Sequence, residues 1–197
     1  MTYQFVQPLV TTRLRLRRIQ PGDEKAICRY RGLMDVARYQ GWKTFNLEDA
    51  AQLIEEQSAS EPGIPGTWFQ LAIVESVGDL LIGDCGLYCW PDDPSQLELG
   101  ITISPEHQRR GFATESLRCV LDYGFRELAM HRISAVTDDR NVAAAAVFRG
   151  LGFRLEGYFL EHRWFKGSWN SEYLFAILRR EWLRAHEPGS PSFPPLS

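Results

Sequence analysis

The stretch "SPEHQRRGFATES" (104–116) combines residue types that can bind an anion. It follows the apolar run "ELGITI" (98–103) and leads into a helix predicted to begin near Phe112. The first amides of a helix have no internal partners and carry partial positive charge, so they suit phosphate oxygens. Gly111 lets a ligand approach the backbone, and two arginines beside it add forked cationic donors. We interpret the stretch as a candidate pyrophosphate site, with solvated arginines at an ordinary helix start as the alternative.

Composition limits the classes of protein to which the chain can belong. Its 197 residues suit one domain with a sizeable core, and 44% hydrophobic with 24% charged residues is ordinary for a soluble globular protein. The net charge of −3 argues against a general nucleic-acid binder. Neither a Walker P-loop nor a Rossmann glycine fingerprint is present.

The cysteines and the apolar runs indicate a cytoplasmic protein. Four cysteines, at 28, 85, 89 and 119, form no CxxC pair, and no histidine lies at zinc-finger spacing. We therefore expect free thiols in a reducing compartment and no metal. We see no signal-peptide core and no apolar run long enough to span a membrane, so we expect no membrane partner.

Hydrophobic periodicity predicts the elements that must position the candidate site. Their order is β-α-α-β-β-β-α-β-α-β-β, a mixed α/β domain over residues 11–184, followed by a flexible Pro/Ser-rich tail, 185–197. The strands are expected at 11–19, 67–75, 80–90, 97–103, 131–137, 152–165 and 171–182, and the helices at 21–34, 46–58, 112–129 and 141–153.

Two motifs in order give the sequence a recognisable pattern. Gln108, Gly111 and Ala113 form Q-x-x-G-x-A after the apolar strand, which resembles the acetyl-CoA loop of the GNAT N-acetyltransferases. Downstream, "DDRNVAAAAVFRGLGFRLEGY" (138–158) resembles the N-x-x-[SA] to G-F segment of the same superfamily. The ends "TTRLRLRRI" and "KGSWNSEYLFAILRREW" resemble the RimJ/RimL-like branch, whose characterised members acetylate N-terminal amines of ribosomal proteins. The resemblance implies the GNAT fold: a central, mostly antiparallel twisted sheet with a V-shaped split and helices on both faces.

The resemblance also implies where acetyl-CoA binds as co-substrate. A bulged strand would part from its neighbour, and the freed backbone of "LGITI" would hydrogen-bond to the pantetheine arm. One of its amides would stabilise the negative charge that develops on the thioester carbonyl. The expected cofactor-binding positions are Ile101, Thr102, Ile103, Gln108, Arg109, Arg110, Gly111, Phe112, Ala113, Thr114, Asn141, Ala144 and Phe148.

The second motif departs from the family pattern. Asn141 matches the asparagine that contacts the pantetheine arm or a bound water, and it also suits the cap of the following helix. Many GNAT enzymes place a proton-donating tyrosine seven residues later, and some RimL-like members place a serine three residues later. Here those positions hold Phe148 and Ala144. Water or another group would have to protonate the leaving thiolate.

Three residues are candidates for the base that deprotonates the acceptor amine. Glu98 opens the cofactor strand and matches an acid common there in the family, with a structural acid as the alternative. Glu161 and His162 lie on a later strand, where some relatives place an acid near the acceptor. Because successive strand residues face opposite ways, at most one of the two should point into the slot.

The resemblance favours a protein N-terminal α-amine as the acceptor. Near neutral pH an α-amine of pKa about 7.7–8.0 costs about 1 kcal/mol to deprotonate, and a lysine about 4–5. A site with few acid and base groups therefore suits an α-amine better than the side-chain amine of a lysine.

Several other readings stay open. A small-molecule amine, polyamine or aminoglycoside-like, is the main alternative acceptor. A non-catalytic acyl-CoA-binding module and a homodimer are also open, and the charge balance makes a nucleic-acid partner unexpected. The dense aromatics of 39–45 and 158–169 could be packing or an apolar wall over the acceptor.

Overall fold

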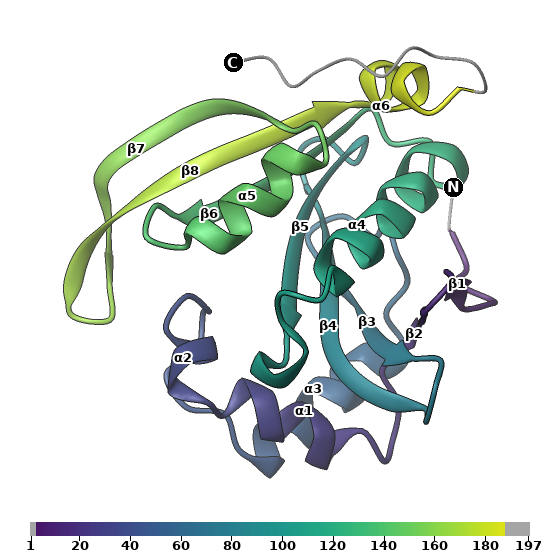
Figure 1. Cartoon of the computed structure of the whole chain (residues 1–197), viewed down its shortest axis with the longest axis vertical. Helices are drawn as coiled ribbons and strands as arrows, with labels where there is room; N and C mark the ends of the chain where they lie inside the picture. The colour runs from purple at the N-terminus through teal and green to yellow at the C-terminus, as the bar shows by residue number, and fades with distance from the viewer. Residues whose placement is uncertain (1–2, 188–197) are drawn as a thin grey trace.

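Eight strands form one sheet of order β1-β2-β3-β4-β5-β6-β8-β7 in the computed structural model, which describes residues 3–187 (Figure 1). The strands are β1 Leu9–Val10, β2 Leu14–Arg18, β3 Trp68–Glu75, β4 Leu80–Cys89, β5 Gln96–Ile103, β6 Arg132–Asp138, β7 Arg154–Phe165 and β8 Ser168–Leu178. The helices are α1 Glu24–Arg31, α2 Met34–Ala37, α3 Leu47–Ser58, α4 Phe112–Asp122, α5 Val142–Gly150 and α6 Arg179–Ala185, with a 3-10 turn at Pro105–His107 and a π-helical turn at Tyr123–Glu127. The expected mixed α/β, mostly antiparallel architecture is confirmed.

The sheet splits between β5 and β6, its only parallel neighbours among the described strands. Their pairing covers three positions and ends where Glu98 faces Ser134. Beyond that point β5 continues beside β4 as far as Ile103, while β6 continues beside β8 as far as Asp138. The free edges of β5 and β6 therefore face a gap, which is the V-shaped split that the resemblance implied.

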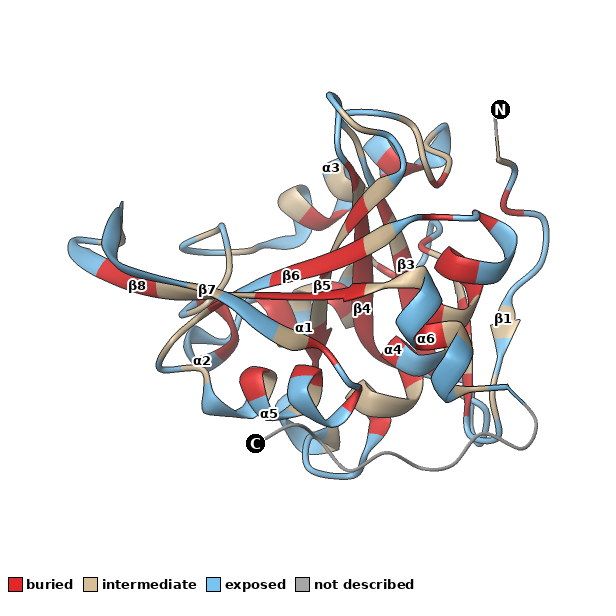
Figure 2. Ribbon diagram, turned by 90° about the horizontal axis from the view of Figure 1, so that it is seen from above, coloured by how far each residue is buried: buried red, intermediate tan, exposed pale blue. Residues whose placement is uncertain are grey.

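Helices cover the two faces of the sheet with separate apolar clusters. On one face Ile27 of α1 and Ile54 of α3 pack on Ala72 and Val74 of β3. On the other face α4, α5 and α6 pack on the main core. Figure 2 shows buried residues along the central strands between these layers, whereas the β7–β8 hairpin extends outward and its strand β7 is largely exposed. The residues predicted to face the core from the 112–129 helix are all buried: Leu117, Val120 and Leu121 in α4, Gly124 in the π-helical turn and Leu128 directly after it.

Most predicted elements are present, although the helix expected at 21–34 spans only Glu24–Arg31, and β1 and α2 were not predicted. The predicted capping residue of α3, Asn46, accepts hydrogen bonds from the amides of Glu48 and Asp49 at 2.7 and 3.1 Å. The last strand, expected to reach residue 182, ends at Leu178, and α6 follows. The Glu181 carboxylate accepts a hydrogen bond from the Leu178 amide at 2.8 Å and so stabilises the start of this unpredicted helix. The predicted 112–129 helix ends at Asp122 and continues as the π-helical turn.

The remaining structural expectations concern thiols, metals, membranes and the tail. All four cysteines are free thiols, and burial raises the pKa of Cys85 in β4. Within residues 3–187 no group of three or more metal-ligating side chains gathers, and no helix is long and apolar enough to cross a bilayer. Ordered elements reach Ala185, and the rest of the predicted flexible tail, 188–197, lies outside the described residues.

Candidate active site

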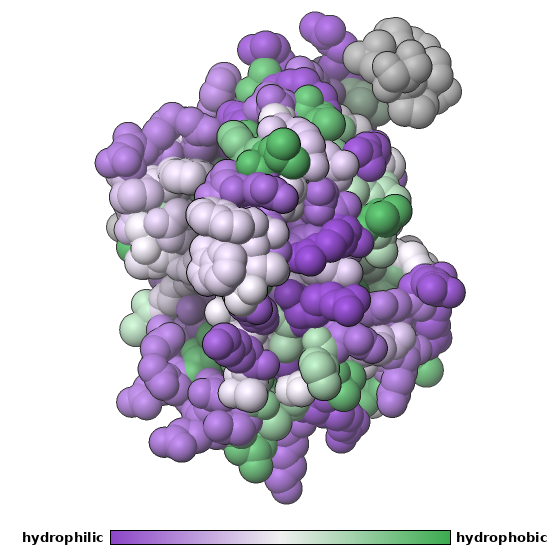
Figure 3. All heavy atoms as spheres, turned by 90° about the vertical axis from the view of Figure 1, so that its left-hand side faces the viewer, coloured by the Kyte–Doolittle hydropathy of each residue, from purple (hydrophilic) through white to green (hydrophobic). Residues whose placement is uncertain are grey.

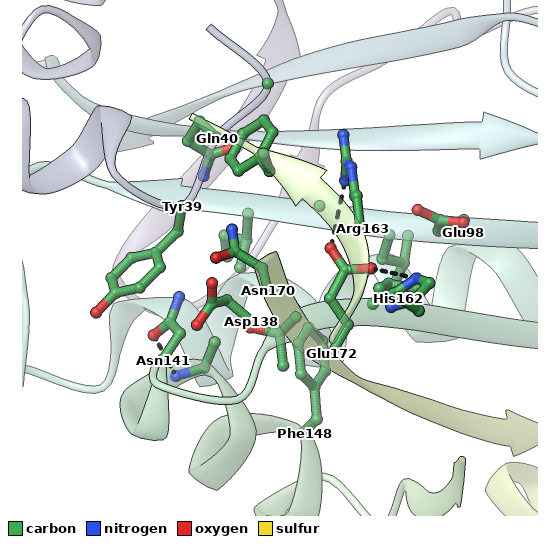
Figure 4. Close-up of a pocket in the computed structure, with 18 residues that line it drawn as sticks. Tyr39, Gln40, Glu98, Asp138, Asn141, Phe148, His162, Arg163, Asn170 and Glu172 are labelled. Carbon is green, nitrogen blue, oxygen red and sulfur yellow. Dashed lines mark hydrogen bonds and ion pairs between the residues drawn. The ribbon is translucent and has the colours of Figure 1, made fainter. Parts of the chain in front are cut away.

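The split between β5 and β6 opens into a cavity of about 440 Å³ (Figure 4). Its walls come from both diverging strands, the start of α5, residues 39–41 after α2, and the β7–β8 hairpin. The cavity therefore joins the strand expected to bind the cofactor to the strands expected near the acceptor. The predicted site residues that line it are Glu98, Ile101, Asn141, Ala144, Phe148 and His162.

The loop between β5 and α4 is held in a fixed shape by one side chain and two unusual backbone conformations. The Gln108 amide donates a hydrogen bond to the Ile103 carbonyl at 2.9 Å, which ties the loop to the end of β5. Arg109 and Gly111 have φ angles of 59° and 80°. A residue other than glycine costs about 1–2 kcal/mol of conformational free energy in this left-handed region. Glycine is therefore the suitable residue at position 111, the N-cap of α4. Gln108, expected to contact the cofactor, thus shapes the loop that would do so.

The first N–H groups of α4 are available to an anion. Glu115 N donates to Gly111 O at 3.0 Å, which is the first bond of the helix. Among the described residues, the N–H groups of 109–114 have no hydrogen-bond acceptor. Together with the small Ala113 and the exposed Gly111, these amides form the kind of turn that the predicted diphosphate site requires, and diphosphate binding there stays a prediction.

Arg13 supports this turn from a distant strand end. Its guanidinium donates to the Arg110 carbonyl at 3.0 Å and to the Glu115 carboxylate at 2.7 Å. Arg13 and Arg110 also stack over the buried Phe112 ring, at 4.5 and 5.0 Å from its centroid. Arg109 and Arg110 are exposed, so both can reach a bound anion. Nothing in the local sequence links Arg13 to Arg110, because 97 residues separate the two.

The start of α5 lines the cavity without supplying a hydroxyl at the family positions. Asn141 Oδ1 accepts a hydrogen bond from Ala144 N at 3.1 Å, so the asparagine does cap the helix (Figure 4). Phe148 is 3% exposed and stacks within the core. Two other residues carry hydroxyls and line the cavity, Tyr39 from the loop after α2 and Thr137 from β6. The sequence indicated Tyr39 only as a possible part of an apolar wall, and it offered no signal for Thr137.

Glu98 lies at the point where the sheet divides. It is the last residue of β5 that pairs with β6, and its half-buried side chain lines the cavity. Burial raises the pKa of the Glu98 carboxyl, the nearby charge of Glu172 raises it further, and Arg163 partly lowers it. A carboxylate whose pKa is raised is a stronger base than an exposed glutamate.

The β7–β8 hairpin supplies the opposite wall of the cavity. His162 lines it and lies 3.2 Å from the Glu172 carboxylate, which also forms an ion pair with Arg163 at 3.3 Å (Figure 4). Glu161 is exposed and does not line the cavity, and its amide N–H donates to Ser171 Oγ at 2.9 Å. Of the two adjacent candidates, therefore, only His162 reaches the cavity. Sequence reasoning missed Glu172 and Arg163.

A buried ion pair anchors the loop on the acceptor side. Asp84 is 3% exposed and accepts hydrogen bonds from Tyr30 at 2.5 Å and from Arg31 at 2.8 and 2.9 Å. The Arg31 guanidinium lies 4.5 Å from the Trp42 ring centroid, and Trp42 Nε1 donates to the Arg31 carbonyl at 3.0 Å. The aromatics of this loop thus divide between packing and lining, since Tyr39 is the one that lines the cavity.

A split sheet, free amides at a helix start and a cavity with one basic carboxylate define a class of protein that binds an acyl-CoA beside an amine. Comparison with known families agrees. Residues 13–154 match the acetyltransferase (GNAT) domain, and the chain belongs to this family. It is therefore an N-acetyltransferase whose co-substrate is acetyl-CoA. The finer resemblance to the RimJ/RimL-like branch is not confirmed and stays a prediction.

Curated relatives are also named as N-acetyltransferases, and only some of their names state the acceptor. The uncharacterized N-acetyltransferase p20 of Bacillus licheniformis is 28% identical over 90% of this chain and 99% of its own length. The spermidine N(1)-acetyltransferase of Escherichia coli is 31% identical over 51% of this chain and 54% of its own.

Solved structures share the fold over most of the chain. A GNAT-family acetyltransferase from Bacillus anthracis superposes with a TM-score of 0.80 at 25% identity, covering 89% of this chain and all of the other. The spermidine N-acetyltransferase of Vibrio cholerae, in complex with CoA and spermine, gives a TM-score of 0.75 at 23% identity, covering 88% and 99% of the two chains. These similarities confirm the expected GNAT fold.

Proposed function

We propose that this enzyme transfers the acetyl group of acetyl-CoA to the α-amine of a peptide or protein N-terminus. The family match supports the transfer to an amine. The choice of acceptor rests on a single observation, which is the balance of charges around the cavity.

Three carboxylates line the cavity, and two of them already have cationic partners. Asp138 forms an ion pair with Arg140 at 2.6 Å, and Glu172 forms one with Arg163. Within residues 3–187, Glu98 has no ion pair. One free negative charge suits an acceptor with one ammonium group. A polyamine carries several, and each would need a partner or would lose hydration near Arg163.

Glu98 is the proposed base. Its position at the division of the sheet places it next to the free edge of β5, along which the thioester would lie. It would take a proton from the bound ammonium, so that the free amine can attack the thioester carbonyl. The N–H groups of β5 beyond Glu98, around Ile101, would stabilise the negative charge on that carbonyl oxygen.

His162 has a different proposed role. It lies beside Glu172, which Arg163 also holds, and its side chain is 41% exposed. A base is more effective where water is excluded, which favours Glu98 over His162. We assign His162 to positioning the Glu172 carboxylate, and we assign no role to Glu161.

The names of several relatives favour a polyamine acceptor instead, so the test must separate the two acceptors. Thiol release from acetyl-CoA would be measured with four acceptors: a short peptide with a free N-terminus, the same peptide N-blocked but carrying lysine, spermidine, and an aminoglycoside. Mass spectrometry would locate the acetyl group on each product. A Gly111→Asp variant, which brings a carboxylate to the anion loop, serves as the cofactor control.

The expected result is release that requires a free α-amine and is lost in Gly111→Asp. Release with spermidine but not with the peptide would overturn the proposed acceptor and would favour the polyamine alternative. Acetylation of the blocked peptide on lysine would overturn it as well, since it would show that the site deprotonates the more basic amine.

A further inference from the structure

A second pocket, of about 400 Å³, lies beside the cavity and is strongly basic. Four of its ten lining residues are cationic, and Asp35 is its one anionic residue. Phe165 and Asn170 line both spaces, so the pocket adjoins the acceptor side of the cavity. We call it the basic pocket, and its cationic residues are Arg38, Lys43, Arg140 and Lys166.

Among the described residues, only Arg140 of these four cations has a carboxylate partner, and Lys166 bonds to backbone carbonyls instead. Arg38 and Lys43 are exposed, and neither forms an ion pair with any residue of the described chain. Arg38 contributes to the low pKa of Asp138: burial raises that pKa, but the bonds from Arg140, with a smaller effect of the Arg38 charge, lower it overall. The charge of Arg38 therefore affects a carboxyl group that lines the cavity.

Lys166 joins the two walls of the basic pocket. It lies at the tip of the β7–β8 hairpin, and its ammonium donates hydrogen bonds to the carbonyls of Ala37 and Trp42. These bonds tie the hairpin to the segment that carries Arg38 and Lys43. Burial lowers the pKa of Lys166, and the charge of Lys43 lowers it further, so an anion bound between them would be favoured. The hairpin and α2 lie on the side of the molecule that faces the viewer in Figure 3, where hydrophilic side chains predominate.

We propose that the basic pocket binds an anionic oxygen group, a carboxylate or a phosphate, that the acceptor carries within two or three residues of the amine it presents to Glu98. The inference rests on the proposed function and narrows it: the preferred N-terminus is one followed closely by an acidic or phosphorylated residue. We infer this short spacing because the two pockets share Phe165 and Asn170 and an extended chain advances about 3.3–3.6 Å per residue.

The position of the pocket favours the acceptor over acetyl-CoA as the source of the anion. The free amides at the start of α4 already provide a site for the diphosphate of the co-substrate. The basic pocket shares its walls with the opposite side of the cavity, where Phe165 and Asn170 belong to the β7–β8 hairpin. An acceptor lying between the two sites would place its amine near the split and its anion near Lys43.

The test uses C-terminally amidated peptides with a free N-terminal alanine. The residue at position 2 or 3 would be aspartate, asparagine, phosphoserine or lysine, and the near-isosteric pair aspartate and asparagine isolates the effect of side-chain charge. We expect kcat/KM to be about 3- to 10-fold higher for aspartate than for asparagine, with lysine lowest. The aspartate advantage should shrink as salt is raised from about 0.05 to 0.5 M, because the pocket is open to solvent. Comparing phosphoserine with aspartate distinguishes the two anion sources.

Two matched pairs of variants separate the pocket from general surface charge. Lys43→Gln and Arg38→Gln remove exposed, unpaired cations of the pocket, whereas Lys25→Gln and Arg29→Gln remove exposed, unpaired cations of α1. We expect the pocket variants to lose the aspartate advantage and to retain activity with the asparagine peptide. The α1 variants should behave as the unmodified protein does.

Three results would overturn the inference. One is equal kcat/KM for the aspartate and asparagine peptides. Another is an unchanged aspartate preference in Lys43→Gln and Arg38→Gln. The third is a pocket variant that raises KM for acetyl-CoA and leaves acceptor KM unchanged, which would assign the pocket to the co-substrate. Acetylation of no α-amine peptide at all would instead reject the proposed function from which the inference starts.

Discussion

Replacement of Glu98 by glutamine tests the proposed chemistry most directly. Glutamine keeps the size of the side chain and removes its ability to accept a proton, so the cavity should keep its shape. Because Glu98 has no ion-pair partner among residues 3–187, the change leaves no buried cation uncompensated. A loss of activity would then reflect the missing base.

The two pKa values set the free-energy cost of the proton transfer, and the usual contribution of a positioned base sets the expected loss of rate. Moving a proton from an α-ammonium, pKa about 7.7–8.0, to a carboxyl at its ordinary value of 4.5 costs about 4–5 kcal/mol. Each unit by which burial raises the Glu98 pKa removes about 1.4 kcal/mol of that cost, while a lysine acceptor, pKa about 10.4, adds about 3–4. A positioned base typically contributes about 10²–10⁴ in rate, so Glu98→Gln should lower kcat by at least about 100-fold.

The assay is thiol release over pH 5 to 9 at saturating acetyl-CoA, with Glu161→Gln as the matched control. Glu161 is an exposed glutamate outside the cavity, and its replacement should change kcat less than about twofold. Because Glu98 acts as the carboxylate, kcat falls as the pH drops through its pKa, and burial shifts that fall above the pH of an ordinary glutamate. Arg163 lowers the Glu98 pKa, so Arg163→Gln should move the fall to still higher pH. A Glu98→Gln enzyme within threefold of the unmodified rate across this range would refute the assignment.

Three further changes probe the elements around the site. Asp84→Ala leaves the guanidinium of Arg31 buried without its partner, so it should lower the unfolding free energy by about 3–5 kcal/mol in chemical denaturation. The double variant Asp84→Leu, Arg31→Met removes both charges and should lose less stability. Equal losses in the two variants would contradict this account. Gly111→Val forces a β-branched residue into the left-handed region, so it should raise KM for acetyl-CoA about 10-fold and leave KM for the acceptor unchanged. An unaltered KM for acetyl-CoA would show that the loop does not bind the co-substrate. Tyr39 lines the cavity, and Tyr39→Phe should lower kcat about 10-fold on the hypothesis that its hydroxyl protonates the thiolate. An unchanged kcat would leave water as the donor.

Local sequence signals predicted most of the fold. The Asn46 cap, the apolar spacing of α4 and the glycine before it each depend on residues within one turn, where sequence order and spatial order coincide. The position of the loop before α4 was predictable for the same reason, while its binding of an anion stays a prediction. The last strand was extended too far because "RREW" fits a strand and a helix equally well, and the capping carboxylate of Glu181 decides between them.

Long-range pairing accounts for what the sequence did not reveal. Glu172 and Arg163 face each other only through the register of the β7–β8 hairpin, which shifts between Phe159 and Arg163. The basic pocket likewise gathers residues separated by more than 100 positions, such as Lys43 and Lys166. Nothing within one turn or one strand marks such residues, because charges that meet across a fold look like ordinary surface charges in the sequence.

The division of the sheet links the binding of the co-substrate to the basicity of Glu98. Had β5 stayed paired with β6 as far as Ile103, its outer backbone groups would have been used in the sheet, and no cavity would lie beside it. Because pairing ends at Glu98, the next residues of β5 keep free backbone groups for a thioester arm, and the carboxylate sits at the closed end of the split. The surrounding strands bury that carboxylate and raise its pKa, while Arg163, on the opposite wall, limits the rise. In the proposed mechanism, the place where two strands part supplies a half-buried base with a raised pKa, and the register of β5 against β6 then matters as much as the identity of residue 98.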